Sequence, residues 1–325
     1  MMSSLRRIPA RAPARAPARP PARLLARNAA RAAVPALLLC VLGAATSAQS
    51  LGAPASPACA DCAVWNAPQR PFRVFGNTYF VGTHGLSALL VTSDSGHVLL
   101  DGGLPESAPL ILQHIRELGF RIEDVRFIVN SHVHFDHAGG LAELQRRSGA
   151  VVAASASSAA VLRSGAVGRD DPQHGLLAPI APVARVQTVA DGQTLHVGPL
   201  ALTAHATGGH TPGGTSWSWR SCEGAHCLDL VYADSQTPVS ADGFFYTRSA
   251  TYPTALADFA RGLATLDTLP CDILVTPHPD ASGLWQRLAR RDSGDATALI
   301  DAGACKRYAA GARARVAKRV ADEGR

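Results

Sequence analysis

Three short histidine-bearing segments constrain the fold of this chain more than any other feature. They are residues 131–137 (SHVHFDH), 208–214 (GGHTPGG) and 276–279 (TPHP). The first closely follows the apolar run 127–129 and the third directly follows 273–275, while the second separates two predicted strands. Loops that follow strands can converge on one site, so we expect the fold to bring these distant segments together.

The residue types in these segments indicate a metal site. Imidazole is a good ligand for zinc, and carboxylates complete sites for the same metal. His132 and His134 alternate by two, so in an extended segment both side chains point to one side. Two zinc ions at roughly 3.5–4 Å can share a hydroxide and clamp a hydrolytic transition state. Six candidate ligands divide into two sets of three, which leaves positions open for solvent: His132, His134, Asp136, His137, His210 and His278.

Simpler interpretations of these histidines are weaker. Histidines that stand alone, such as His97, His114 and His196, are typical of surface or satisfied core positions. The pattern H-x-H-x-D-H with two further histidines downstream is hard to reach by chance. A purely structural zinc site is a weaker interpretation, because such sites are usually closed and rich in cysteine.

The first 48 residues resemble an export signal rather than part of a domain. They contain eight arginines and no acidic residue, followed by the apolar run 32–45 and small residues up to Ala48. The run is too short to span a bilayer comfortably and contains Pro35, so we predict a signal peptide that is cleaved after Ala48. An RNA-binding arm would not explain the apolar run and lacks interleaved aromatic residues.

Removal of this segment reverses the sign of the net charge. The whole chain has 31 Lys and Arg against 25 Asp and Glu, which suggests a nucleic-acid partner. Without residues 1–48, 23 basic residues face the same 25 acidic ones, a net charge near −2. We therefore predict no nucleic-acid partner and no membrane anchor after processing. Residues 49–70 are expected to form an irregular arm and residues 71–325 a single domain, exported to the periplasm as a monomer.

Six cysteines remain after the predicted cleavage, and an oxidising compartment favours disulfides among them. Two flank a short polar loop and could close a hairpin-like ring. Two are left as a longer-range pair between a strand and a C-terminal helix, and two near the new N-terminus are either bonded to each other or free. The pair that flanks the polar loop is Cys222 and Cys227, the longer-range pair is Cys271 and Cys305, and the pair near the new N-terminus is Cys59 and Cys62. Six cysteines formally allow fifteen pairings.

The alternation of apolar and polar residues predicts an α/β protein. A β-rich block with one helical crossover precedes a second β block that ends in helices, and two packed mixed sheets with helices outside, an αββα sandwich, satisfy this order. Predicted strands lie at 78–81, 86–92, 97–101, 126–129, 150–153, 186–189, 200–205, 215–220, 229–233 and 272–275. Predicted helices lie at 108–118, 140–147, 253–268 and 302–321, and residues 164–184 are a predicted loop.

Together the three segments resemble the metallo-β-lactamase superfamily over most of residues 70–310, and within it the third subclass of class B. Histidine occupies all three of the positions His132, His134 and His137. The segment 232–235 (YADS) has Ser235 where other subclasses have a cysteine ligand, and GHTPGGTSW at 209–217 also matches.

The resemblance implies an αββα fold and a two-zinc active site. His132, His134 and His210 would hold one zinc ion, and Asp136, His137 and His278 the other. The implied activity is hydrolysis of the β-lactam ring of penicillins, cephalosporins and carbapenems by a hydroxide that bridges the metals, which confers antibiotic resistance. Asp136 would orient this nucleophile, and Ser235 and Thr237 would contact the antibiotic carboxylate. Some relatives have a cysteine at the position of His84, which leaves the partner of Cys59 or Cys62 open.

Two alternatives remain open from the sequence. If Asp234 bridges the two metals, as in lactonase and thioesterase relatives, this would favour a lactone or thioester substrate over a β-lactam. A periplasmic zinc-binding protein without catalysis is the second alternative. The loop 164–178, with Gln173 and His174, and the arm around Trp65 are candidate flanks of a substrate groove.

Overall fold

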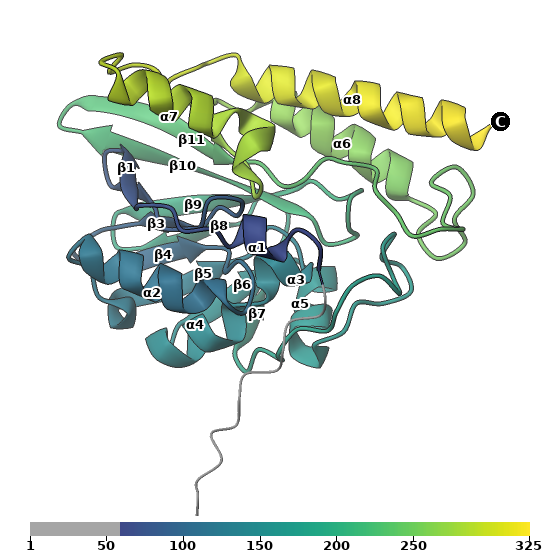
Figure 1. Ribbon diagram of the computed structural model, residues 1–325, viewed down its shortest axis with the longest axis horizontal. Helices are drawn as coiled ribbons and strands as arrows, with labels where there is room; N and C mark the ends of the chain where they lie inside the picture. Colours follow the sequence, from purple (N-terminus) through teal and green to yellow (C-terminus); the bar gives the residue numbers. More distant parts are fainter. Residues whose placement is uncertain (1–58) are drawn as a thin grey trace, which may run out of the picture. The chain divides into compact units, whose positions relative to one another are not determined.

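Two β-sheets pack face to face in the computed structural model, and helices cover their outer faces (Figure 1). The structure describes residues 59–325, which fall within one unit, Ala53–Arg325. The predicted signal peptide, residues 1–48, lies outside the described residues. Within the described part of the chain, no helix has the length and apolar character needed to cross a membrane. The αββα architecture predicted from the sequence is confirmed.

The first sheet has seven strands in chain order, antiparallel from β1 to β4 and parallel from β4 to β7. Helices α2 (Ser107–Glu117), α4 (Leu141–Ser148) and α5 (Ala156–Ser164) lie on its outer side, as Figure 1 shows. The strands are β1 (Phe72–Phe75), β2 (Thr78–Phe80), β3 (Leu89–Val91), β4 (His97–Leu100), β5 (Val125–Val129), β6 (Val151–Ala154) and β7 (Val186–Thr188). The short helices η1 (Ile122–Asp124) and α3 (Phe135–Ala138) flank β5 in the sequence.

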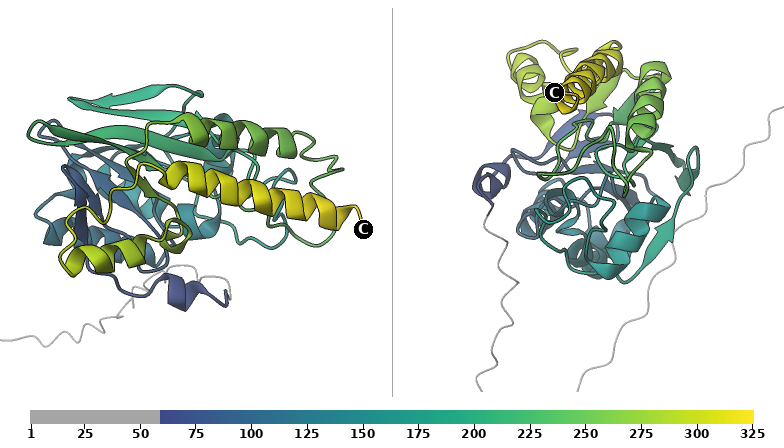
Figure 2. Two further views of the ribbon diagram at one scale, coloured as in Figure 1. Left: turned by 90° about the horizontal axis from the view of Figure 1, so that it is seen from above. Right: turned by 90° about the vertical axis from the view of Figure 1, so that its right-hand side faces the viewer.

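The second sheet has five strands in the order β12-β11-β10-β9-β8, all antiparallel except the pair β11 and β12. The strands are β8 (Thr194–Val197), β9 (Leu200–Ala206), β10 (Thr215–Glu223), β11 (His226–Tyr232) and β12 (Ile273–Val275). Helices α6 (Ala255–Thr268), α7 (Leu284–Asp292) and α8 (Ala304–Glu323) belong to this half of the domain, and Figure 2 shows them together on one side. The short helix η2 (Pro279–Ser282) follows β12.

Alternating side chains explain the layers. Trp217 and Trp219 of β10 and Tyr232 of β11 belong to the apolar cluster between the two sheets. Val231, one residue before Tyr232, points the other way and joins the cluster beneath α6 and α8. A third cluster packs the first sheet against α2 and α4 through residues such as Ile128. Each sheet therefore has two apolar faces, which requires a helical layer on each outside.

Several elements differ from the prediction made from the sequence. The structure adds β1, β8, α5 and α7, and it places the four-residue helix α1 (Cys62–Trp65) in the arm expected to be irregular. The sequence signal for the start of α5 is Ser155 at the N-cap. Its hydroxyl accepts a hydrogen bond from the Ser158 amide. Among residues 59–325 the structure contains three disulfides, Cys59–Cys62, Cys222–Cys227 and Cys271–Cys305.

Candidate metal centre

Four loops that follow strands β5, β9, β11 and β12 meet at one edge of the two sheets. The strands β9, β11 and β12 run in the same direction, because β9 and β11 are both antiparallel to β10 and β12 is parallel to β11. The Thr215 amide donates to the Ser131 carbonyl at 2.8 Å, and the Trp217 indole donates to the Asn130 carbonyl at 3.1 Å. These two bonds join the β5 loop of the first sheet to β10 of the second.

The first cluster of ligand atoms comes from His132, His134 and His210, all buried. The ring centroids of these histidines lie 4.7–4.9 Å apart. One ligand atom from each lies within 4.8 Å of the others. Three imidazoles from the β5 and β9 loops therefore face one point.

Each histidine of this cluster has one ring nitrogen engaged by another loop. His132 Nδ1 lies 2.8 Å from Asp234 Oδ1, and His210 Nδ1 lies 2.8 Å from a main-chain carbonyl, that of Thr237. His134 Nε2 lies 3.2 Å from an oxygen of Asp171. The other ring nitrogens, Nε2 of His132 and His210 and Nδ1 of His134, are therefore the candidate ligand atoms. Metal-binding histidines usually donate their other ring N–H to a carboxylate or carbonyl in this way.

The second cluster consists of Asp136, His137 and His278. Asp136 Oδ2 lies 3.1 Å from His137 Nε2 and 3.3 Å from His278 Nε2, and the two Nε2 atoms are 3.2 Å apart. A tetrahedral zinc ion with bonds of about 2.0–2.1 Å holds its ligand atoms about 3.3 Å from one another. The spacing of these three donors fits a metal ion.

The hydrogen bonds of the site support the same conclusion. His132 Nε2 is buried and has no hydrogen-bond partner among the described residues. A buried nitrogen without a partner is costly unless something binds it. His278 Nδ1 lies 3.3 Å from the Gly85 carbonyl, which leaves its Nε2 for the second cluster. The donor set of five imidazoles and one carboxylate suits zinc.

Burial and neighbouring charges put three of these groups in the protonation states that metal binding requires. Burial lowers the pKa of His132, and it lowers the pKa of His210 to about 3, so both rings are neutral at pH 7. Burial alone would raise the pKa of Asp136, but the neighbouring His137 and His278 hold it well below its usual range. His132 and His210 are thus neutral, and Asp136 is ionised.

Asp101 holds the β5 loop in place through hydrogen bonds to Ser131. This residue was not identified from the sequence as part of the site. Its carboxylate accepts hydrogen bonds from the Ser131 amide at 2.7 Å, the Ser131 hydroxyl at 2.6 Å and the Tyr232 hydroxyl at 2.8 Å. Asp101 has a φ of 58°, a conformation that few residues other than glycine adopt. The signal available in the sequence was an aspartate at a strand end before two glycines.

The other residues predicted from the sequence lie at the same edge of the sheets. Asp234 contacts His132 but is not one of the clustered ligands. Ser235 is buried beside it, and the Thr237 hydroxyl lies 3.2 Å from His210 Nδ1. The ring of Trp65 lies 5.2 Å from that of His278.

The loop 164–178 was considered only as a flank of the groove. It carries Asp171, whose contact with His134 was not foreseen, and Gln173 lies 3.5 Å from the same ring. The structure places no contact between His174 and the six candidate ligands. Both sides of the His134 ring therefore face this loop.

Comparisons with known proteins agree with this geometry. A model of the metallo-beta-lactamase superfamily matches residues 81–293. The solved structure of Rm3 metallo-beta-lactamase is 57% identical, with a TM-score of 0.81 over 83% of this chain and 100% of that one. MEM-A1, a subclass B3 metallo-beta-lactamase from a soil metagenome library, is 54% identical, with a TM-score of 0.79 over 80% of this chain and 98% of that one.

A shorter match concerns a different activity. An N-acyl homoserine lactonase of Bacillus cereus is 31% identical over 74 residues, which cover 16% of this chain and 30% of that enzyme. The chain therefore spans only about 30% of the length of the curated relatives that it matches.

Proposed function

The chain belongs to the metallo-beta-lactamase superfamily, and we propose that it hydrolyses the β-lactam ring of antibiotics in a zinc-dependent reaction. The observation that carries this proposal is the convergence of six donors in two groups of three. Identities of 57% and 54% over four fifths of the chain, with metallo-beta-lactamases of known structure, support the choice of substrate class.

The two clusters would hold two zinc ions. His132, His134 and His210 would bind one, and Asp136, His137 and His278 the other. Bound zinc would polarise the lactam carbonyl and lower the pKa of water towards about 7. The site needs no serine nucleophile for this chemistry, because an acyl-enzyme is not required.

Asp136 also orients the nucleophile in this proposal. Its Oδ2 faces both His137 and His278, and the depressed pKa keeps the carboxylate ionised, so it accepts hydrogen bonds and donates none. Ser235 and Thr237 lie on the loop after β11 and would bind the carboxylate of the antibiotic. Thr237 lies beside His210, and Ser235 follows Asp234, which contacts His132.

Apolar side chains on α1 and on two loops suit the uncharged parts of such a substrate. Val64 precedes Trp65, Leu176 follows Gln173, and Val239 follows Thr237 in the chain. These three are the large apolar residues that are strongly exposed in the described part of the chain. Exposed apolar residues that flank a polar centre are typical of a ligand-binding groove.

Export to the periplasm is part of the proposal. The basic and apolar character of residues 1–48 supports a signal peptide, and the three disulfides suit an oxidising compartment. There the enzyme would act on antibiotics before they reach their targets and so confer resistance.

Lactone hydrolysis is the second candidate, and the local match to homoserine lactonases favours it. Such a reaction was expected to use Asp234 as a ligand shared by both metals. In this structure Asp234 Oδ1 instead lies 2.8 Å from His132 Nδ1, where it orients a ligand. We therefore rank β-lactam hydrolysis above lactone hydrolysis.

One set of assays separates these possibilities. The zinc-loaded protein is assayed with a carbapenem, an N-acyl homoserine lactone and a glutathione thioester, with and without a chelator. We expect carbapenem hydrolysis that the chelator abolishes and that His210→Ala lowers at least about a hundredfold. His196→Ala, an exposed histidine on β8, is the matched control and should retain activity. Carbapenem hydrolysis that is absent from the zinc-loaded protein would overturn the proposal, and turnover of the lactone alone would select the alternative.

A further inference from the structure

The segment between β11 and α6 carries the two hydroxyl side chains proposed to bind the substrate, Ser235 and Thr237. In the described chain β11 ends at Tyr232, and no helix or strand follows until α6 begins at Ala255. Main-chain groups in such a segment need partners in other elements to hold one conformation. Contacts from outside the segment must therefore fix the two hydroxyls.

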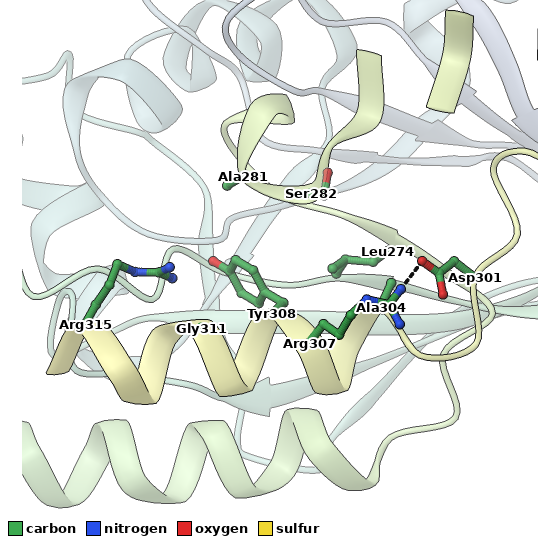
Figure 3. A pocket seen from close by; sticks show the side chains of 9 residues that line it. All are labelled: Leu274, Ala281, Ser282, Asp301, Ala304, Arg307, Tyr308, Gly311 and Arg315. Atoms are coloured by element: carbon green, nitrogen blue, oxygen red, sulfur yellow. Dashed lines mark hydrogen bonds and ion pairs between the residues drawn. The ribbon is translucent and has the colours of Figure 1, made fainter. Parts of the chain in front are cut away.

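Helix α8 supplies such contacts along one side. In Figure 3 the side chains of Tyr308 and Arg315 rise from the same side of α8, and both line a pocket of about 280 Å³ between this helix and η2. Residues three, four or seven positions apart share one face of a helix. The α8 residues that bond to the segment, in the same order in which their partners follow one another between Asp234 and Thr247, are Tyr308, Arg315, Arg319 and Glu323.

Tyr308 holds the residues on either side of Ser235. Its hydroxyl donates to the Asp234 carbonyl at 2.9 Å and accepts from the Gln236 amide at 3.1 Å. Its ring is buried in the apolar cluster beneath α6 and α8. Burial raises the pKa of the Tyr308 hydroxyl, which therefore keeps its proton and can donate. One hydroxyl group thus fixes both main-chain neighbours of Ser235.

Arg319 holds the chain beyond Thr237. Its guanidinium donates to the Ser240 hydroxyl and to the Phe244 carbonyl, each at 2.8 Å. It also donates to the carbonyl of Pro238, the residue directly after Thr237, at 3.4 Å. A single side chain of α8 therefore gathers three residues of the segment.

The part of the segment that faces the metal ligands has separate supports. The Asp234 amide donates to the Ser216 hydroxyl of β10 at 2.9 Å. The Gln236 side-chain amide donates to the carbonyl of Thr207, the residue after β9, at 2.8 Å. These bonds do not involve α8, so the contacts of α8 can be removed while the metal centre keeps its own supports.

We propose that Tyr308 and Arg319 are positioning residues for substrate binding, because they hold Ser235 and Thr237 where these bind the carboxylate of the substrate. The inference rests on the proposed function and assigns to α8 no contact with substrate or metal. Groups that are fixed in advance lose less conformational entropy on binding than mobile ones. Helix α8 therefore contributes to substrate affinity rather than to the chemical step.

Steady-state kinetics of the zinc-loaded protein with benzylpenicillin and with its methyl ester test the proposal. Tyr308→Phe keeps the buried ring and removes only the hydroxyl, and Arg319→Met keeps a long side chain without donors. Each should raise KM for benzylpenicillin at least about fivefold and change kcat less than about twofold, because the lost binding is shared by ground state and transition state. The ester lacks the negative charge that the hydroxyls bind, so its kcat/KM should change less than about twofold.

Two controls accompany these variants. Arg313→Gln is matched to them, because Arg313 lies on the same helix but pairs with Asp267 of α6, and it should leave KM for both compounds unchanged. The zinc content of all three variants, measured by mass spectrometry, should equal that of the wild type. This second control separates positioning of the substrate from support of the metal ions.

An unchanged KM for benzylpenicillin in both variants would overturn the proposal, and a rise in only one would overturn the role of the other residue. An equal loss with benzylpenicillin and its ester, or a loss of zinc from Tyr308→Phe, would also overturn it, because either result would indicate general damage to the site. Tyr308→Phe decides the question if Arg319→Met fails to fold. Hydrolysis of neither compound by the zinc-loaded wild type would instead overturn the proposed function, and this inference with it.

Discussion

At the scale of single residues, the candidate metal centre depends on groups that hold the ligands as much as on the ligands. Each histidine of the first cluster is oriented by a residue from outside its own loop: Asp234 for His132, Asp171 for His134 and Thr237 for His210. Such partners set the tautomer and the direction of the ring. The affinity for metal should therefore be sensitive to them.

Asp171→Ala tests this dependence. The Asp171 carboxylate also accepts from the Gln173 amide at 2.8 Å, so its loss frees both the His134 ring and the loop. We expect zinc affinity to fall by about 10–100-fold, measured by competition with a chromophoric chelator. Asp170→Ala, at the exposed neighbouring position, should leave the affinity unchanged. Equal zinc affinity in Asp171→Ala and wild type would show that Asp171 does not position His134.

The six candidate ligands could be predicted from the sequence, but most of their supports could not. H-x-H-x-D-H is a local pattern, and its spacing is visible in a single segment. Asp171 and Asp101 reach the site through loop conformation and a positive φ, which no periodicity reports. Asp234 was noticed in the sequence, but only the structure shows which group it contacts.

At the scale of elements, the helices over the second sheet differ in how closely they approach it. Gly262 of α6 lies against Thr207, the residue where the His210 loop begins, and a Cβ atom there would meet the Thr207 Cα at 2.8 Å. A Cβ atom at Gly311 of α8 would instead meet only Nη1 of Arg315, at 3.5 Å, an ordinary contact with a flexible side chain. The same substitution should therefore have opposite effects on the two helices.

Gly311→Ala should raise the free energy of unfolding by about 0.5–1 kcal/mol, because alanine is a better helix former and meets no obstacle. Gly262→Ala should lower it by about 1–3 kcal/mol, since the main chain at Thr207 must move. Urea unfolding of both variants measures the difference. Destabilisation by both, or by neither, would contradict the packing described for α6 and α8.

The last turn of α8 holds the loop between β11 and α6. The Glu323 carboxylate accepts from the amides of Tyr246 and Thr247 at 2.9 and 2.8 Å. Burial alone would raise the pKa of Glu323, but these amides and Arg319 outweigh burial and hold it below the usual value of 4.5. A lowered folded-state pKa means that the stabilisation is complete above about pH 4.5 and is lost as the pH falls through the folded-state value.

Glu323→Gln should therefore cost about 1–3 kcal/mol at pH 7 and progressively less below about pH 4.5. Urea unfolding of both proteins between pH 7 and pH 3.5 gives the difference at each pH. Glu117→Gln, on the exposed face of α2, is the control and should show no such trend. A difference that stays constant over this range would rule out the ionised carboxylate as the cause.

Element prediction succeeded where the pattern was long and failed where the element was short or amphipathic in an unusual way. The long helices α6 and α8 and the apolar strand β5 were predicted within a few residues. Helix α7 was not, because four of its nine residues, LWQRLARRD, are charged and its Arg287 is buried. The main-chain carbonyls that accept from Arg287 come from other segments and cannot be read from α7 itself.

At the scale of the whole molecule, one covalent link joins the C-terminal helix to the second sheet. Cys271 precedes β12 and Cys305 lies in the first turn of α8, 34 residues apart. In the chain-entropy model such a link stabilises the fold by about 4 kcal/mol, against about 2 kcal/mol for the five-residue separation of Cys222 and Cys227.

Removing each pair tests this difference. The double variant Cys271→Ala/Cys305→Ala should lose more stability than Cys222→Ala/Cys227→Ala, measured by thermal unfolding without reductant. Reducing agent should lower the midpoint of the wild type towards that of the first variant. An equal effect of the two double variants would show that the link between α8 and the sheet is not what stabilises the domain.

The architecture could be predicted from the order of strands and helices, because two sheets with two apolar faces each admit few arrangements. The pocket that Ser282, Asp301 and Arg315 line beneath α8 could not, because only the packing of α8 against β12 and η2 brings these side chains together.

The central claim is that six residues from three loops form a two-metal hydrolytic site, and zinc stoichiometry tests it most directly. The protein is dialysed against excess zinc and then buffer, and its zinc content is measured by mass spectrometry. We predict two zinc ions per chain in the wild type, and one in each of the variants His210→Ala and His278→Ala. One zinc ion per chain in the wild type, or two in either variant, would contradict the account.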